Sequence, residues 1–305
     1  MESVRVVLAA DLGGTKTAVG VVNREGAILA KRKAAAEKPG PAATAAQVAE
    51  LAEAALADAS VSREAVAGAG VCVPGIYFED SGEAWAPNLW GGGQAPIKRL
   101  LEPRLPAPVV IDSDRSACVL AEQWLGAARG LSDVVFLAVG TGIGAGIIAG
   151  GRLVRGASGI AGAVGWFALA PQRQPLYRQM GCFEAEAAGP AVARRAAALG
   201  LPGLSPEKVA RRARLGDPAA VEAFEQTAAW LGMGVANIVS LLNPQMVVLG
   251  GGLMQAGDLL LEGVRRHMLA WAQPVSGEEV RLELSRLGED AGLLGAARLA
   301  WLKGE

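Results

Sequence analysis

One pattern occurs twice in this chain: an apolar strand, a turn rich in glycine, and a second strand. The first copy passes through the hexapeptide DLGGTK at residues 11–16, and the second through GTGIGAG at residues 140–146. Apolar and β-branched residues before each turn predict strands at 4–10 and 134–139. The repetition indicates an internally duplicated protein in which each half is built around its own sheet.

Segments with strand or helix periodicity follow each copy of this pattern. Further strands are expected at 17–22, 66–73, 108–111, 245–249 and 280–284. Helices are expected at 42–59, from 114 to about 127, near 184–199, and at 206–213, 218–242, 258–271 and 292–302. This alternation of strands and helices predicts an α/β protein.

The content of histidine and cysteine excludes several kinds of active site. The chain of 305 residues has a single histidine, His267, and three widely separated cysteines, Cys72, Cys118 and Cys182. A zinc site with two histidines and an iron site with two histidines and a carboxylate are therefore impossible. The cysteines form no disulfide framework, which fits a reducing compartment. The chemistry must depend on carboxylates, backbone groups and a bound cofactor.

Charge and hydropathy favour neither a nucleic-acid-binding protein nor a membrane protein. The formal net charge of −1 provides no excess of cations to neutralise the phosphates of DNA or RNA. The longest uncharged run, residues 134–151, contains six glycines, so we expect two strands there and not a transmembrane helix. The N-terminus also lacks the pattern of a signal peptide. We expect a cytoplasmic protein that binds neither nucleic acid nor membrane.

The two glycine-rich turns are predicted to bind phosphate through their backbone amides. A dinucleotide fingerprint would lead from a strand into a helix, whereas both turns lead into strands, and DLGGTK lacks the spacing of a Walker A motif. Glycines at a hairpin tip still allow successive N–H groups to surround an anion. Two such turns could hold a triphosphate, and ordinary hairpin turns are the alternative.

Seven short motifs, taken in order, resemble the ROK family of sugar kinases and repressors. They are DLGGTK at 11–16, Pro74-Gly75, APNLW at 86–90, SDRSACVLAE at 113–122, GTGIGAGII at 140–148, GCFE at 181–184 and NPQMVVLGGGL at 243–253. The resemblance covers nearly the whole chain. It implies the actin-like ATPase (ribonuclease H-like) fold, with two lobes, a mixed five-stranded sheet in each, and a central cleft. We expect residues 1–113 and 291–305 in the N-terminal lobe and residues 114–290 in the C-terminal lobe.

The resemblance implies transfer of the γ-phosphate of ATP to a sugar hydroxyl with Mg²⁺. At the matching positions, Asp114 is the expected general base, and Asp11 is expected near Mg²⁺ through phosphate or water. The other expected nucleotide-binding residues are Gly13, Gly14, Thr15 and Lys16 in the first loop, Gly140, Thr141 and Gly142 in the second, and Gly250, Gly251 and Gly252 beside the adenosine. Those expected on the sugar side are Asn88, Ser113, Asp114 and Glu184.

Ordinary structural roles compete with these assignments. An aspartate at a helix start, such as Asp114, is more often an N-cap than a base. Asn88 could stabilise a turn, and Gly250–Gly252 could form a bend after a strand. The order of the motifs favours the functional roles. Surface positions are expected for His267, Lys31–Lys33, Arg194-Arg195 and Arg211-Arg212.

The chain departs from the family pattern on the sugar side. Where the family has G-x-A-G-E-x-G-H, this sequence has GIAGAVGW, so Ala163 replaces a sugar-binding Glu and Trp166 replaces a His that binds sugar and zinc. Pro175 and Tyr177 replace two zinc cysteines, and Cys182 alone cannot hold tetrahedral zinc. We therefore expect no zinc. Trp166 is expected to fill the space left by the imidazole and the metal, and stacking on a sugar is the alternative.

These departures predict a changed acceptor. Hydrogen bonds to charged groups contribute about 1.5–3 kcal/mol each, so loss of the Glu weakens the binding of a usual hexose. We expect a kinase for an altered sugar, and the alternative is a catalytically degenerate ROK protein that binds nucleotide or sugar as a sensor or partner. A chaperone-type ATPase is disfavoured because no peptide-binding domain follows. Only ten residues precede Asp11, so no helix-turn-helix domain is expected. The family also implies a homodimer.

Overall fold

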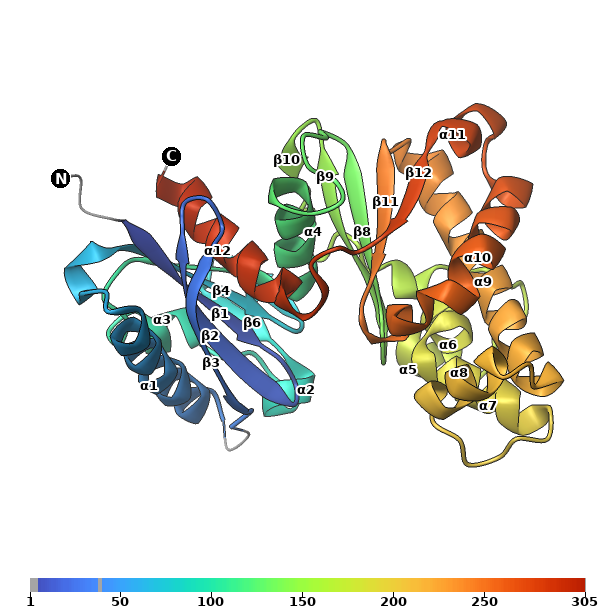
Figure 1. Ribbon diagram of the computed structural model, residues 1–305, viewed down its shortest axis with the longest axis horizontal. Coiled ribbons are helices and arrows are strands. Elements are labelled where there is room, and N and C mark those ends of the chain that lie inside the picture. The colour runs from blue at the N-terminus through green and yellow to red at the C-terminus, as the bar shows by residue number, and fades with distance from the viewer. Residues whose placement is uncertain (1–4, 38–39, 305) are drawn as a thin grey trace. The chain divides into compact units, whose positions relative to one another are not determined.

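The computed structural model describes residues 5–37 and 40–304, which form two compact units (Figure 1). Unit 1 consists of the described residues up to Gly126, the segment Arg155–Ile160 and the residues from Glu289 onward. Unit 2 consists of Ala127–Val154 and Ala161–Gly288. Val4, the expected start of the first strand, lies outside the described residues.

Unit 1 contains a mixed five-stranded sheet. Its strands are β1 (Val6–Leu12), β2 (Lys16–Asn23), β3 (Ile28–Ala35), β4 (Val66–Val73) and β7 (Val109–Ser113). They lie in the order β3-β2-β1-β4-β7, in which β1, β2 and β3 are antiparallel and β1, β4 and β7 are parallel. Strand β1 is buried along almost its whole length because helices cover both faces of the sheet.

The helices of unit 1 lie on opposite faces of this sheet (Figure 1). Helix α1 (Pro41–Ala59) places alanines, Val48 and Leu56 against the side chains of β1 and β2. Helix α12 (Ala291–Gly304) packs on β1 and β4 and against α4 (Asp114–Trp124). The shorter elements are η1 (Arg63–Ala65), β5 (Ile76–Phe78), β6 (Glu83–Trp85), α2 (Pro87–Trp90) and α3 (Ile97–Leu101).

Two glycines allow α12 to approach its neighbours closely. A Cβ on Gly70 of β4 would lie 1.7 Å from the carbonyl oxygen of Ala296 in α12. A Cβ on Gly295 would lie 1.8 Å from the carbonyl oxygen of Ala117 in α4. Backbone therefore packs on backbone at both contacts, and α12 fixes the position of α4 relative to the sheet.

Unit 2 repeats the sheet of unit 1. Its strands are β8 (Val134–Val139), β9 (Ile143–Ala149), β10 (Arg152–Leu153), β11 (Met246–Gly250) and β12 (Arg281–Leu284). Their order, β10-β9-β8-β11-β12, has the same pattern of antiparallel and parallel neighbours. The expected duplication and the two five-stranded mixed sheets are thus confirmed.

One large core in unit 2 packs against β8 and β11. It is built by α6 (Cys182–Ala187), α7 (Gly189–Ala198), α8 (Pro206–Arg214), α9 (Pro218–Leu242) and α10 (Gly257–Trp271). Unit 2 also contains α5 (Tyr177–Met180), α11 (Pro274–Glu279) and the 3₁₀ turns η2 (Val164–Trp166) and η3 (Gly252–Ala256), and the turn η4 (Gly288–Asp290) lies where the chain returns to unit 1. The expected helix near 184–199 is two helices, because Ala188 is extended and Pro190 cannot donate the amide bond that continues a helix. Within residues 5–37 and 40–304, every helix is too short or too polar to span a lipid bilayer.

The chain divides at different places from those expected. Helix α4 belongs to unit 1, not to a lobe that begins at residue 114, because it packs against α12. The segment Arg155–Ile160 also belongs to unit 1, and the Arg155 Nε lies 2.7 Å from Oδ2 of buried Asp112. Asp11 and Asp114, the two carboxylates expected at the reaction centre, are therefore held by one unit.

Candidate functional site

The first glycine turn is a tight hairpin tip between β1 and β2. The Gly13 amide donates to the carbonyl oxygen of Lys16 at 2.9 Å, and a Cβ on Gly13 would lie 2.8 Å from the same oxygen. Thr15 and Lys16 are exposed, and Gly14 lies against Asn88, whose Cβ would be 3.6 Å from a Cβ on Gly14. The structure thus uses the Gly13 amide to close the turn and brings Asn88, an exposed residue of α2, beside it.

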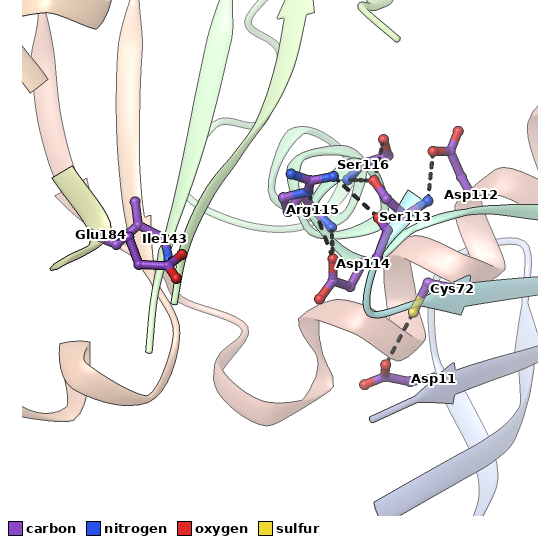
Figure 2. Close-up of polar contacts among 10 residues, drawn as sticks. Asp11, Cys72, Asp112, Ser113, Asp114, Arg115, Ser116, Ile143 and Glu184 are labelled. Carbon is purple, nitrogen blue, oxygen red and sulfur yellow. Dashed lines mark hydrogen bonds and ion pairs between the residues drawn. The ribbon is translucent and has the colours of Figure 1, made fainter. Parts of the chain in front are cut away.

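Asp11 lies next to this turn, and Figure 2 shows one of its two neighbours, Cys72. It pairs in register with Cys72 of β4, whose Sγ donates to Asp11 Oδ1 at 3.1 Å. On the other side, a Cβ on Gly292 would lie 2.6 Å from Oδ2. Burial raises the pKa of Asp11, while the Cys72 hydrogen bond and Lys33 act in the opposite direction. Burial and the Asp11 charge raise the pKa of the Cys72 thiol well above its usual value, so the thiol is a proton donor at neutral pH.

Asp114 is the first residue of α4, and its neighbour caps the helix. Ser113 Oγ accepts the amide of Ser116 at 3.2 Å and pairs with Ser116 Oγ at 3.0 Å. The N-cap interpretation of Asp114 is therefore wrong, since Ser113 performs that role. Ser113 is 5% exposed and its hydroxyl caps the helix, and its contact with a sugar stays a prediction.

The Asp114 carboxylate is accessible and has a perturbed pKa. Its Oδ1 accepts the amide of Arg115 at 2.8 Å, and 44% of its side-chain surface is exposed. Desolvation by the surrounding protein raises the pKa of Asp114 to about 6, Arg115 opposes this shift, and the Asp11 charge adds to it. The Arg115 guanidinium lies 4.0 Å from Oδ1 and also donates to the carbonyl oxygen of Gly75 at 3.2 Å (Figure 2). A carboxylate with this pKa is ionised at neutral pH and is still basic enough to accept a proton.

The second glycine turn joins β8 to β9 in unit 2. The Gly140 amide donates to the carbonyl oxygen of Gly142 at 2.9 Å. Glu184 supports the turn: its Oε2 accepts the amide of Ile143 at 2.8 Å, and a Cβ on Gly142 would lie 2.7 Å from that oxygen. Burial raises the pKa of Glu184. The structure thus places Glu184, which was expected on the sugar side, against the second glycine turn.

A cavity of about 390 Å³ opens beside this turn. Its walls include Gly140, Thr141, Pro206, Ala210, Gly252 and Gln255. The second glycine turn and the Gly250–Gly252 segment meet here, because a Cβ on Gly140 would lie 3.6 Å from the Gly252 amide nitrogen. The volume falls within the range of small-molecule sites. No motif in the sequence marked α8, which supplies one wall of the cavity.

The three glycines at the end of β11, Gly250 to Gly252, have different roles. A Cβ on Gly250 would lie 2.3 Å from Cζ of Phe136, and Gly251 has a φ of +91° with Val139 packed against it. These two glycines allow the chain to bend and pack tightly, which agrees with the alternative prediction of a bend at the end of a strand. Gly252 lines the cavity, and no atom lies within 4 Å of its Cβ position.

A polar network occupies the region where the family pattern has zinc cysteines. The Tyr177 hydroxyl donates to Glu186 Oε1 at 2.8 Å, and Arg195 Nη2 lies 2.9 Å from Glu186 Oε2. Arg195 also donates to Thr227 Oγ1 at 3.1 Å, and its side chain is only 12% exposed, so its predicted surface position is wrong. Cys182 packs in the same small cluster. Among the described residues there is no group of three or more His, Cys, Asp or Glu side chains placed to hold a metal.

This network predicts that the fold does not depend on zinc. Treatment with a strong zinc chelator is expected to leave the melting temperature unchanged, whereas Tyr177→Phe is expected to lower the free energy of unfolding by about 1.5–3 kcal/mol. Denaturation of both proteins in urea measures this difference. Tyr77→Phe changes the other tyrosine and serves as the control, with an effect within about 0.5 kcal/mol. A chelator-induced fall in melting temperature would contradict the prediction.

Trp166 does not fill an interior space. Val164 and Gly165 of η2 are buried, but Trp166 is 59% exposed, so the space-filling interpretation is wrong. Its indole instead presents an exposed aromatic face on unit 2. His267 pairs with Glu225 at 2.9 Å near the surface, as expected.

The carboxylates of unit 1 fit a hard divalent cation. Mg²⁺ typically binds one or two carboxylates together with waters and substrate phosphates. Asp11 offers a carboxylate beside a hairpin tip with exposed residues, and its orientation is fixed on both sides. Asp11 therefore suits a cation that is held mainly by phosphate and water.

Comparison with known proteins places these features in one family. The sequence matches the model of the ROK family over residues 7–303. A glucokinase of Streptomyces coelicolor is 34% identical over 316 aligned residues, which cover 97% of each chain. The crystal structure of a ROK hexokinase from Thermus thermophilus has a TM-score of 0.82 at 36% identity, covering 98% of this chain and 99% of that one. A ROK family glucokinase from Streptomyces griseus, crystallised with glucose and AMPPNP, has a TM-score of 0.79 at 31% identity, with 97% and 99% covered. The expected actin-like ATPase fold is confirmed by these structural neighbours.

Proposed function

This chain belongs to the ROK family, and from that premise we propose that it is an ATP-dependent kinase for a hydroxyl of a sugar or sugar-like polyol. The observation that carries the proposal is the cavity of about 390 Å³ between the Gly140–Gly142 turn and Gly252, which has the size and the loop composition for a nucleotide. The AMPPNP complex of the Streptomyces griseus glucokinase supports ATP as the donor.

The proposal assigns the nucleotide to unit 2. Adenosine would lie in the cavity against Pro206, Ala210 and Gly252, with its phosphates toward Gly140 and Thr141. Glu184 would act indirectly by holding the Ile143 amide and thereby the shape of the turn. Gly14 and Thr15 of the first turn are the proposed donors to the transferred phosphate, since the Gly13 amide is already donated to Lys16.

The proposal assigns the chemistry to Asp114. The sugar oxygen would attack the γ-phosphorus, the bond from that phosphorus to the β,γ-bridging oxygen would break, and ADP would leave. Asp114 would orient the attacking hydroxyl and accept its proton. Asp11 would hold Mg²⁺ through phosphate or water, and the ion, when bound, neutralises charge on the phosphates.

Two features support an acceptor other than the usual hexoses. Ala163 offers no carboxylate where the family pattern has Glu, and exposed Trp166 offers an aromatic face that can stack on the apolar face of a sugar ring. The same loss favours a second candidate function, a catalytically degenerate protein that binds nucleotide or sugar without transfer.

An ADP-release assay across a panel of hexoses, pentoses, amino sugars and polyols tests the proposal. We expect turnover with at least one member of the panel that depends on both Mg²⁺ and ATP. Calorimetry with AMPPNP runs in parallel. Protein that binds AMPPNP but phosphorylates none of the panel would reject the kinase and favour the degenerate binder.

Filling the cavity is expected to abolish nucleotide binding. Gly252→Phe adds a side chain where no protein atom lies within 4 Å, so the ring can enter the cavity without unfolding unit 2. We expect the Kd for AMPPNP to rise more than about tenfold, which corresponds to about 1.4 kcal/mol. Arg211→Phe, on the exposed face of α8, is the matched control and should bind normally. A folded Gly252→Phe protein with unchanged Kd would show that the nucleotide binds elsewhere.

A further inference from the structure

Cys72 is a buried thiol in direct contact with a carboxylate of the proposed site. It is 0% exposed and lies on β4, paired in register with Asp11 on the adjacent parallel strand β1. Its Sγ lies 3.1 Å from Asp11 Oδ1 (Figure 2). Neighbouring positions on paired strands place both side chains on the same face of the sheet, so the contact follows directly from the register.

The thiol has one proton and two acceptors within reach. The carbonyl oxygen of Gly292 lies 3.6 Å from Sγ, which is longer than the 3.1 Å to the Asp11 carboxylate. A charged acceptor at the shorter distance forms the stronger hydrogen bond, so the proton points to Asp11. The carbonyl of Gly292 takes the remaining, weaker contact.

The start of α12 also confines the same carboxylate, with its closest approach to the other oxygen, Oδ2. A Cβ on Gly292 would lie 2.6 Å from Asp11 Oδ2 and 2.8 Å from Cγ, so only a glycine leaves space for the carboxylate there. The thiol on Oδ1 and the Gly292 backbone beside Oδ2 together restrict rotation about the side-chain bonds of Asp11. No charged group is required for this restraint.

We propose that Cys72 is a positioning residue for the reaction: its thiol donates to Asp11 Oδ1 and holds the carboxylate in the orientation from which it holds Mg²⁺ through phosphate or water. This inference rests on the proposed function, because it assumes the role of Asp11 in phosphoryl transfer. It adds a residue to which none of the motifs assigns a role.

The S–H stretching band in the infrared spectrum tests the hydrogen bond without any turnover. The band of Cys72 is identified as the one lost in Cys72→Ala, and we expect it at lower frequency than the band of Cys182. Asp11→Asn replaces the charged acceptor with a neutral one, so the Cys72 band should move to higher frequency while the Cys182 band stays in place. A Cys72 band that does not respond to Asp11→Asn overturns the inference.

Metal binding tests the positioning role. With ADP present, Mn²⁺ affinity measured by electron paramagnetic resonance should fall about threefold to tenfold in Cys72→Ala, the effect of one lost hydrogen bond, and Cys72→Ser should restore most of it. Cys182→Ala removes a buried thiol from unit 2 and should leave the affinity unchanged. Equal Mn²⁺ affinity in Cys72→Ala and the unmodified protein overturns the positioning role.

Activity separates this inference from the proposed function. In the kinase assay, Cys72→Ala should raise the Mg²⁺ concentration needed for half-maximal rate by the same factor, with a smaller effect on the KM for the sugar. If the unmodified protein phosphorylates no sugar, the kinase proposal fails. The infrared and Mn²⁺ results still decide whether Cys72 positions Asp11.

Discussion

Asp114→Asn is expected to lower kcat/KM for sugar phosphorylation by about 10²–10⁴-fold, the usual contribution of a general base. Asparagine has the shape of aspartate, and its side-chain oxygen can still accept the Arg115 amide. Ser113 and Ser116 keep the helix capped without Asp114. The substitution therefore removes the proton acceptor and little else. Steady-state kinetics with the best acceptor from the panel measure the loss.

The pH dependence follows from the same carboxylate. Because the pKa of Asp114 is raised to about 6, kcat/KM of the unmodified protein should fall below about pH 6, as the base becomes protonated, and level off above it. The shift has the opposite effect on stability: a carboxyl whose pKa is higher in the folded state stabilises the fold at low pH, and this contribution is lost as pH rises through about 6.

Stability measurements therefore provide the control for the Asp114→Asn kinetics. The variant should gain stability relative to the unmodified protein between pH 5 and pH 8, because it has no carboxyl group to ionise at this partly desolvated position. Denaturation in urea at the two pH values measures this gain. Full activity in a folded Asp114→Asn protein would show that another group accepts the proton.

Gly295→Ala is expected to lower the free energy of unfolding by about 3 kcal/mol. A Cβ at this position would lie 1.8 Å from the carbonyl oxygen of Ala117, so α12 and α4 must separate to accept even a methyl group. Helix propensity alone predicts the opposite sign, a gain of about 1 kcal/mol for alanine over glycine inside a helix. Denaturation in urea decides between the two effects.

A glycine in open space is the control for Gly295→Ala. Gly92 has no atom within 4 Å of its Cβ position, so Gly92→Ala should change stability by no more than about 0.5 kcal/mol. If Gly295→Ala were as stable as the unmodified protein, the close contact between α12 and α4 would not exist in solution. Because α4 carries Asp114, a destabilised Gly295→Ala protein should also lose activity.

Much of the fold could be predicted from the sequence because the evidence for it is local. Alternation of apolar residues and glycine-containing turns marked both hairpins, and the seven strands for which ranges were predicted lie at or near those ranges. The prediction of a single helix near 184–199 was wrong. The break at Ala188 depends on one proline, Pro190, and on packing. The assignment of α4 to unit 1 could not be predicted, since it depends on contact with α12, which lies far away in the sequence.

The candidate site divides in the same way. Sequence motifs were sufficient to select Asp11, Asp114 and the glycine turns, because backbone turns and their glycines are encoded over a few residues. What Glu184 contacts and whether Trp166 is buried depend on neighbours that are distant in sequence, and there the space-filling expectation for Trp166 was wrong.

The sequence by itself determined that this chain is a duplicated α/β protein with two glycine turns and two carboxylates at matching family positions. Only the tertiary structure decided that α8 and Gly252 enclose a cavity beside the second turn, that a thiol on β4 holds Asp11, and that a Tyr-Glu-Arg network lies where the family pattern has zinc cysteines. The physical reason is range: turns and strand patterns are local properties of the chain, whereas cavities, hydrogen-bond partners and burial arise only when distant segments pack together.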